Sequence, residues 1–194
     1  MLLDAIKQLN WLDLAMIVIF FYTIHIALKR GLTAEIFKLM GILTVIFFAT
    51  QYFTKLSDFA IKIFKLQESP APLQFVDFIC FSILAAATYS FFMLLRFIFF
   101  QIFKIEAVSR FNKFGGLILG LVRGILLCAL LSFTLAISSV DYFRNSVAES
   151  YSGIKLFKVY TDTYSLAWQG LMSKFITGEK FNNVVEEVGK GLKQ

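Results

Sequence analysis

Four long runs of apolar residues constrain the fold of this chain more than any other feature. They cover residues 11–28, 32–53, 73–103 and 115–140. The second run alone would make a helix of roughly 33 Å, and the hydrocarbon core of a bilayer is about 30 Å thick. Hydrophobic residues make up 58% of the chain, above the roughly 45–50% of a soluble domain. The sequence therefore predicts an all-α integral membrane protein with four transmembrane helices.

The first two runs are predicted to form a close antiparallel hairpin. Only Lys29, Arg30 and Gly31 separate them, and glycine suits a tight reversal because it tolerates positive φ. A cleaved signal peptide carries its positive charge before the apolar stretch. Here Asp4 and Asp13 come before it and the basic pair follows, so we expect the first helix to be retained.

The third run is too long for a simple span, since its 31 residues would make a helix of about 46 Å. We expect a span over 75–98, with the remainder at the membrane surface. In segments 54–72 and 153–176, helical spacing puts apolar residues on one side of a helix and polar residues on the other. We expect both segments to lie flat at that surface. Residues 180–194 are predicted to be a charged, frayed end. The predicted division is a four-helix domain over 1–141 (spans 11–28, 32–53, 75–98 and 115–140) and an amphipathic, partly flexible tail over 142–194.

The net charge of +6 indicates orientation in the membrane rather than nucleic-acid binding, because the basic residues form no dense patch. Loop 29–31 is short and rich in Lys and Arg, and with four spans loop 96–114 lies on the same side. The positive-inside rule makes both loops cytoplasmic and both termini periplasmic. Cys80 and Cys128 lie inside apolar runs, and no Cys/His cluster suggests a metal site.

The fourth run holds a ladder of small residues and a charge. Gly116, Gly120 and Gly124 recur every fourth residue, a spacing that lets two helices approach closely in lipid. The ladder predicts either packing inside one four-helix bundle or a contact between subunits. Arg123 lies seven residues after Gly116, so it faces within about 20° of it. Two interpretations stay open for Arg123: its side chain reaches the headgroups, or it forms an ion pair across the bundle.

Depth in the membrane identifies a partner for Arg123. Glu35 lies near the cytoplasmic end of the second span and Arg123 toward the same end of the fourth, so we predict that they pair, with Lys38 turned to the headgroups. Asp13 and Asp77 belong near the outer ends of their helices, where a carboxylate suits a helix start. The alternative is that these two line an ion or proton path. A lone His25 indicates a hydrogen-bonding residue at the interface more than a proton switch.

Three local patterns occur in order along the chain. They are Trp11-Leu12-Asp13, then Arg30-Gly31 with Glu35 and Leu39, then Gly116-xxx-Gly120-xx-Arg123-Gly124. Together they resemble the colicin V production (CvpA-like) family of bacterial inner-membrane proteins, over roughly residues 10–140. That family usually carries an Asp-Arg pair before the first glycine, where this chain has Asn112 and Lys113. The resemblance implies the inner membrane and a link to toxin production or export and to envelope homeostasis.

No hydrolase, metalloprotease or phosphate-binding motif occurs, so we expect a protein that is not an enzyme and needs no cofactor. The expected role is accessory or scaffolding. The alternative is a small oligomeric channel or transporter. Expected partners are the lipid bilayer, a second copy of the chain and export or envelope proteins, with no nucleic acid.

Overall fold

The computed structural model describes residues 10–65, 73–102, 109–175 and 179–192, and these residues are helical throughout apart from short connections. The helices are α2 (Trp11–Arg30), α3 (Leu32–Phe64), α4 (Leu73–Ile102), α5 (Ser109–Ala136), α6 (Asp141–Glu149), α7 (Gly153–Ala167), the π-helical turn η2 (Trp168–Met172), α8 (Ser173–Phe175) and α9 (Val184–Gly191). Four of them, α2 to α5, are long and apolar enough to cross a membrane. The all-α membrane fold is confirmed.

Helix α3 is longer than predicted. It continues for 33 residues to Phe64, so the expected separate surface helix over 54–72 is wrong for 54–64; residues 66–72 lie outside the described part. The physical reason is that no glycine or proline interrupts 54–64, and the face that buries Phe53 continues to Ser57. Lys65 ends the helix in the left-handed conformation, with φ of 51°. At about 50 Å, α3 extends beyond the hydrocarbon core.

The other spans also differ at their ends. Helix α4 is continuous from Leu73 to Ile102, and α5 runs from Ser109 to Ala136 rather than over 115–140. Much of the expected loop 96–114 is therefore helical. After Ala136 the chain turns, and the backbone N–H of Val140 donates to Ser138 Oγ. The short α6 follows at Asp141.

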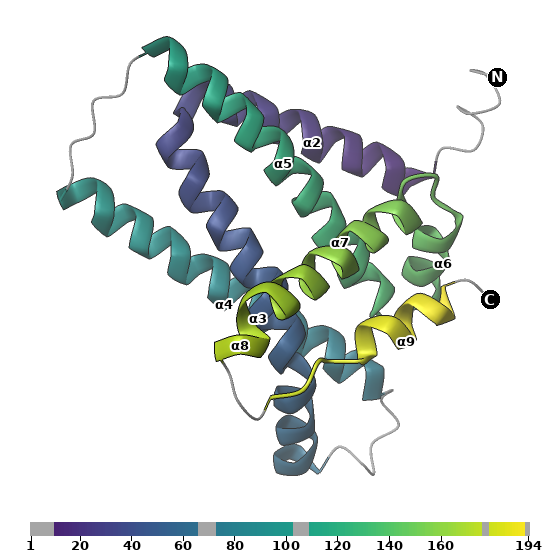
Figure 1. Ribbon diagram of the computed structural model, residues 1–194. Helices are drawn as coiled ribbons and strands as arrows, with labels where there is room; N and C mark the ends of the chain where they lie inside the picture. Colours follow the sequence, from purple (N-terminus) through teal and green to yellow (C-terminus); the bar gives the residue numbers. More distant parts are fainter. Residues whose placement is uncertain (1–9, 66–72, 103–108, 176–178, 193–194) are drawn as a thin grey trace.

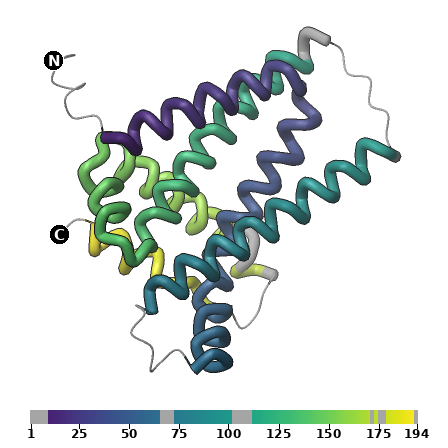
Figure 2. Tube along the Cα trace, turned by 180° about the vertical axis from the view of Figure 1, so that it is seen from behind, coloured from purple at the N-terminus to yellow at the C-terminus, as the bar shows by residue number. Residues whose placement is uncertain are grey.

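The bundle is not built on the expected close hairpin of α2 and α3. These helices touch near their connection and then diverge, while α5 packs along α2 and also against α3 (Figures 1 and 2). Helix α3 packs most extensively against α4. The hairpin prediction failed because α2 packs against the glycine ladder of α5 instead of along α3.

The helices after α5 form a layer over one end of the bundle. Helix α7 crosses α5 and α3, with α9 beside it (Figure 1). Tyr160 is fully buried and stacks on Phe133 of α5, with ring centroids 4.2 Å apart. Phe133 also contacts Phe81 of α4, and Phe81 contacts Phe53 of α3. Aromatic packing therefore joins α7 to three of the spanning helices.

Two expectations for this layer need correction. The segment 153–176 is helical to Phe175 as expected, but its aromatic face is buried in protein rather than at a lipid surface, with Tyr160 and Tyr164 both fully buried. Amphipathic spacing cannot distinguish these two apolar environments. Within the expected frayed end 180–194, residues 184–191 form α9, because Val185 and Leu192 bury against the core.

Candidate functional site

The glycine ladder faces α2. A Cβ placed on Gly116 would lie 2.9 Å from the carbonyl carbon of Gly31, and one on Gly120 would collide with the Ala27 methyl group. A Cβ on Gly124 would lie 2.8 Å from the Phe20 ring. Gly116 meets backbone atoms and Gly120 meets a Cβ atom fixed to the backbone, so the two antiparallel helices require glycine at these two positions, whereas the ring beside Gly124 could shift. The ladder packs inside the chain.

Arg123 extends from the same part of α5 and joins two other helices. Its Nε lies 2.8 Å from Glu35 Oε2 on α3, and its Nη2 donates to the backbone carbonyl of Thr23 on α2 at 3.2 Å. The contact with Glu35 is an ion pair whose angle is not that of a linear hydrogen bond. Arg123 is 4% exposed, so the interpretation in which it reaches the headgroups does not describe this structure.

Lys38 is not turned to the headgroups, which corrects the expectation. Its side chain is buried, and its ammonium group donates to Glu35 Oε1. Residues three apart share a face of a helix, so Lys38 follows Glu35 into the bundle. One carboxylate therefore lies between two cations. We call Glu35, Lys38 and Arg123 the buried triad. Its charges lie within membrane-spanning helices, where each isolated charge would cost about 2.5–3.5 kcal/mol on insertion scales.

The turn between α2 and α3 depends on residues from a third helix. Gly31 has φ of +77°, a conformation that favours glycine. A side chain there would also collide with Asn112 of α5, whose Oδ1 accepts a hydrogen bond of 2.6 Å from the Leu32 backbone N–H. Asn112 thus satisfies a free donor at the start of α3. Arg30 precedes the turn in the last turn of α2.

Asp13 binds the C-terminal layer to the first span. It lies in the first turn of α2, and its Oδ2 accepts from the Asn10 backbone N–H at 3.1 Å. Its Oδ1 accepts from Ser150 Oγ at 2.7 Å, from the Ser152 backbone N–H at 3.0 Å and from the Ser152 hydroxyl. Trp11 Nε1 donates to Ser146 Oγ at 2.8 Å beside it. Sequence alone predicted the helix start but not this partner.

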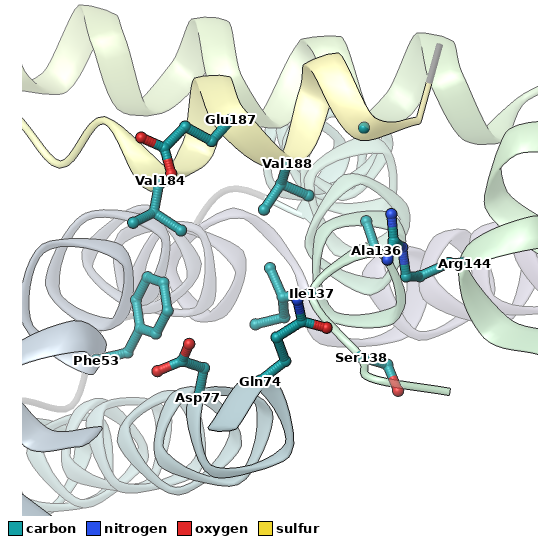
Figure 3. Close-up of a pocket in the computed structure, with 11 residues that line it drawn as sticks. Phe53, Gln74, Asp77, Ala136, Ile137, Ser138, Arg144, Val184, Glu187 and Val188 are labelled. Carbon is teal, nitrogen blue, oxygen red and sulfur yellow. The ribbon is translucent and has the colours of Figure 1, made fainter. Parts of the chain in front are cut away.

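Asp77 and Asp13 do not line a common pocket. Asp77 lies in the second turn of α4 and faces a pocket with Gln74, Arg144 and Glu187 (Figure 3), whereas the pocket beside Asp13 is formed by α2, α5 and α7. The structure thus places these two carboxylates, which were considered for a shared path, in separate pockets. His25 is exposed on α2.

A second group of buried polar contacts holds the segment before α9 against α3. Tyr164 donates its hydroxyl hydrogen to Gln51 Oε1 at 2.6 Å, and Gln51 Nε2 donates to the Lys180 carbonyl at 2.8 Å. Asn182 donates from its backbone to the Tyr164 hydroxyl at 3.1 Å. Burial raises the pKa of Tyr164 to about 12. A hydrogen bond from Lys55 holds the pKa of Glu179 below its usual value.

The described residues include no group of three or more His, Cys, Asp or Glu side chains that could hold a metal ion. The polar groups instead join helices to one another. In a comparison with protein families, residues 12–157 match the colicin V production protein family. This match extends through α6 into α7 and includes Ser150 and Ser152, the partners of Asp13. No curated protein and no solved structure matches the chain.

Proposed function

The chain belongs to the colicin V production protein family, and we propose that it serves as a non-catalytic accessory or scaffolding protein in the production or export of a colicin V-type toxin and in the upkeep of the cell envelope. Its place is the bacterial inner membrane, with both termini in the periplasm. Its partners are the bilayer, a second copy of the chain and export or envelope proteins.

The observation that carries this proposal is the hydrogen bonding of Asp13 to Ser150 and Ser152. These bonds hold the connection between α6 and α7 to the first spanning helix, so the chain presents a structured surface at one end of the bundle. A fixed surface beside a membrane suits a protein that positions others. The buried triad supports the same role, because its contacts hold α2, α3 and α5 together.

The test uses a toxin-producing bacterium whose own copy is deleted and replaced by this chain. Toxin activity in the medium and inside the cells is measured separately, together with growth in a detergent that stresses the envelope. We expect deletion to lower toxin in the medium and to sensitise the cells, and wild-type protein to restore both. Asp13→Asn should restore them poorly at equal membrane abundance. Unchanged toxin and unchanged detergent resistance after deletion would refute the proposal.

A second candidate function is a small oligomeric channel or transporter. It is favoured by the buried triad, because charges within a membrane often mark the route of an ion or solute. Reconstituted protein in liposomes distinguishes the two functions. Solute flux that Glu35→Gln abolishes, while the protein remains folded, would favour the transporter. Liposomes that stay tight favour the scaffold.

A further inference from the structure

A pocket of about 340 Å³ lies under α9 (Figure 3). The start of α4 and the end of α5 form its lower walls, α3 contributes Phe53, and α6 contributes Arg144. Specific small-molecule sites in proteins have volumes of roughly 300–1,000 Å³, so the pocket is large enough for a small polar group. It is separate from the buried triad and from the contacts of Asp13.

The ends of two spanning helices put the pocket at the expected level of a membrane surface. Two spanning helices terminate beside it, because α4 begins at Leu73 and α5 ends at Ala136. Its lining is amphipathic, with Phe53, Ile137 and Val188 supplying apolar surface and charged side chains supplying the rest. Lipid headgroups lie at this depth in a bilayer, so the glycerol and first methylene groups of a bound lipid would meet the apolar part of the pocket.

The charged side chains of the pocket are separated by sign. Asp77 and Glu187 lie on one side, and Arg144 lies across from them (Figure 3). None of these three forms an ion pair within 4 Å with any residue that the structure describes. Gly191 adjoins the Arg144 guanidinium and, having no side chain, leaves it uncovered: a Cβ there would lie 3.3 Å from Nη2.

Two carboxylates on one side of the pocket and a guanidinium on the other favour a zwitterionic ligand. A simple cation would leave Arg144 without a partner, and a simple anion would be repelled by two carboxylates. A primary ammonium supplies three N–H donors for carboxylates, and a guanidinium binds phosphate through paired N–H groups. A quaternary ammonium has no N–H to donate, so a choline headgroup fits less well.

We propose that this pocket binds a phosphoethanolamine group, the headgroup of phosphatidylethanolamine, with its ammonium toward Asp77 and Glu187 and its phosphate toward Arg144. Gln74 adds an amide that can donate to the phosphate. The proposal is independent of any role in toxin export, since it concerns a lipid bound by the chain itself.

The experiment measures lipid binding to the purified full-length protein by native mass spectrometry in detergent. Phosphatidylethanolamine, phosphatidylglycerol and phosphatidylcholine with the same acyl chains are compared, and soluble glycerophosphoethanolamine is added as a competitor. We expect one tightly held phosphatidylethanolamine, at least tenfold preferred over the other two lipids. Arg144→Gln and Asp77→Asn should each reduce this preference about tenfold, the usual scale for a hydrogen bond to a charged group.

Matched controls make the same charge changes on exposed positions of α7: Lys158→Gln for Arg144→Gln, and Asp162→Asn for Asp77→Asn. Both should bind like wild type. Thermal unfolding is recorded for every variant, and Glu187→Gln, on an exposed side chain, replaces any variant that fails to fold. The proposal would be overturned if all three lipids bind equally. It would also be overturned if the control variants lose as much of the preference for phosphatidylethanolamine as the pocket variants do. Competition by the soluble compound at equal affinity would support the chemistry and refute a lipid as its source.

Discussion

Arg123 of α5 lies 2.8 Å from Glu35 of α3 through Nε and reaches the Thr23 carbonyl of α2 through Nη2. One side chain therefore connects three helices, two of which diverge from each other. The glycine ladder allows this contact because it brings α5 against α2, which carries Arg123 into the interior. A packing motif and a charge that looked like separate features of one segment thus act together.

Breaking the Arg123–Glu35 pair from either side should destabilise the fold. Glu35→Gln strands two cations and Arg123→Gln leaves Glu35 with Lys38 alone, so Glu35→Gln should have the larger effect. Removal of one partner of a buried pair typically costs about 3–5 kcal/mol. Thermal unfolding in detergent of each variant and of the charge swap Glu35→Arg with Arg123→Glu completes a double-mutant cycle. The swap should recover part of the loss, and strictly additive effects would contradict direct pairing.

Enlarging the ladder should separate α5 from α2. Gly120→Leu places a branched side chain where even a methyl group would meet Ala27. Overpacking costs roughly 1–3 kcal/mol, and the displaced Arg123 should add to the loss. Gly170→Leu is the matched control, since a Cβ on Gly170 meets nothing within 4 Å. The measurement is yield and melting temperature in detergent. If the two variants melt at the same temperature, the ladder is not a packing face.

Asp13→Asn should loosen the C-terminal layer without removing the spans. An amide has one acceptor oxygen, whereas both carboxylate oxygens of Asp13 accept hydrogen bonds. We expect the free energy of unfolding to fall by about 1–3 kcal/mol, because hydrogen bonds to Ser150 and Ser152 are lost. Hydrogen exchange should report faster exchange over residues 150–152 and little change within α3. The exposed Asp162→Asn gives the baseline, and equal exchange in both variants would contradict a role for Asp13 in holding residues 150–152.

Stability should fall in alkaline solution because of Tyr164. Burial raises its pKa from the ordinary value of about 10 to about 12, so the folded state holds this proton more tightly than the unfolded state. The resulting stabilisation is complete below pH 10 and is lost as the pH rises from 10 through 12. Unfolding across this range in wild type and Tyr164→Phe isolates the contribution. The variant should be less stable at neutral pH, since Gln51 loses a partner, and its stability should fall less as the pH rises. If the stability of both proteins falls equally between pH 10 and 12, this prediction is refuted.

The orientation proposed from the basic loops has its own test. Reporter fusions at residue 104 should lie in the cytoplasm, and fusions at residues 65 and 185 should lie in the periplasm. The two outer positions serve as mutual controls, because α3 and α9 meet the same end of the bundle. The reverse pattern would overturn the orientation and leave the four spans in place.

The sequence predicted the spans well because length and apolarity alone decide whether a helix can cross a bilayer. Glu35 and Arg123 could be matched because depth along a helix can be counted. Lys38 was misplaced, since its distance from the surface did not reveal that a carboxylate three residues away would bind it. Tyr160 and Tyr164 were assigned to lipid because periodicity identifies an apolar face but not what covers it. The divergence of α2 and α3 depends on contacts with α5, which no local pattern contains.

The position of Lys38 has a consequence for the order in which the protein is made. A chain is synthesised from its N-terminus, so α3 enters the membrane before Arg123 has been translated. Glu35 needs a counter-charge during that interval, and Lys38 on the same helix supplies it. When α5 arrives, Arg123 joins a carboxylate that is already neutralised rather than rescuing an isolated one. We therefore expect α3 to carry its own counter-charge for Glu35 during insertion, before Arg123 is made.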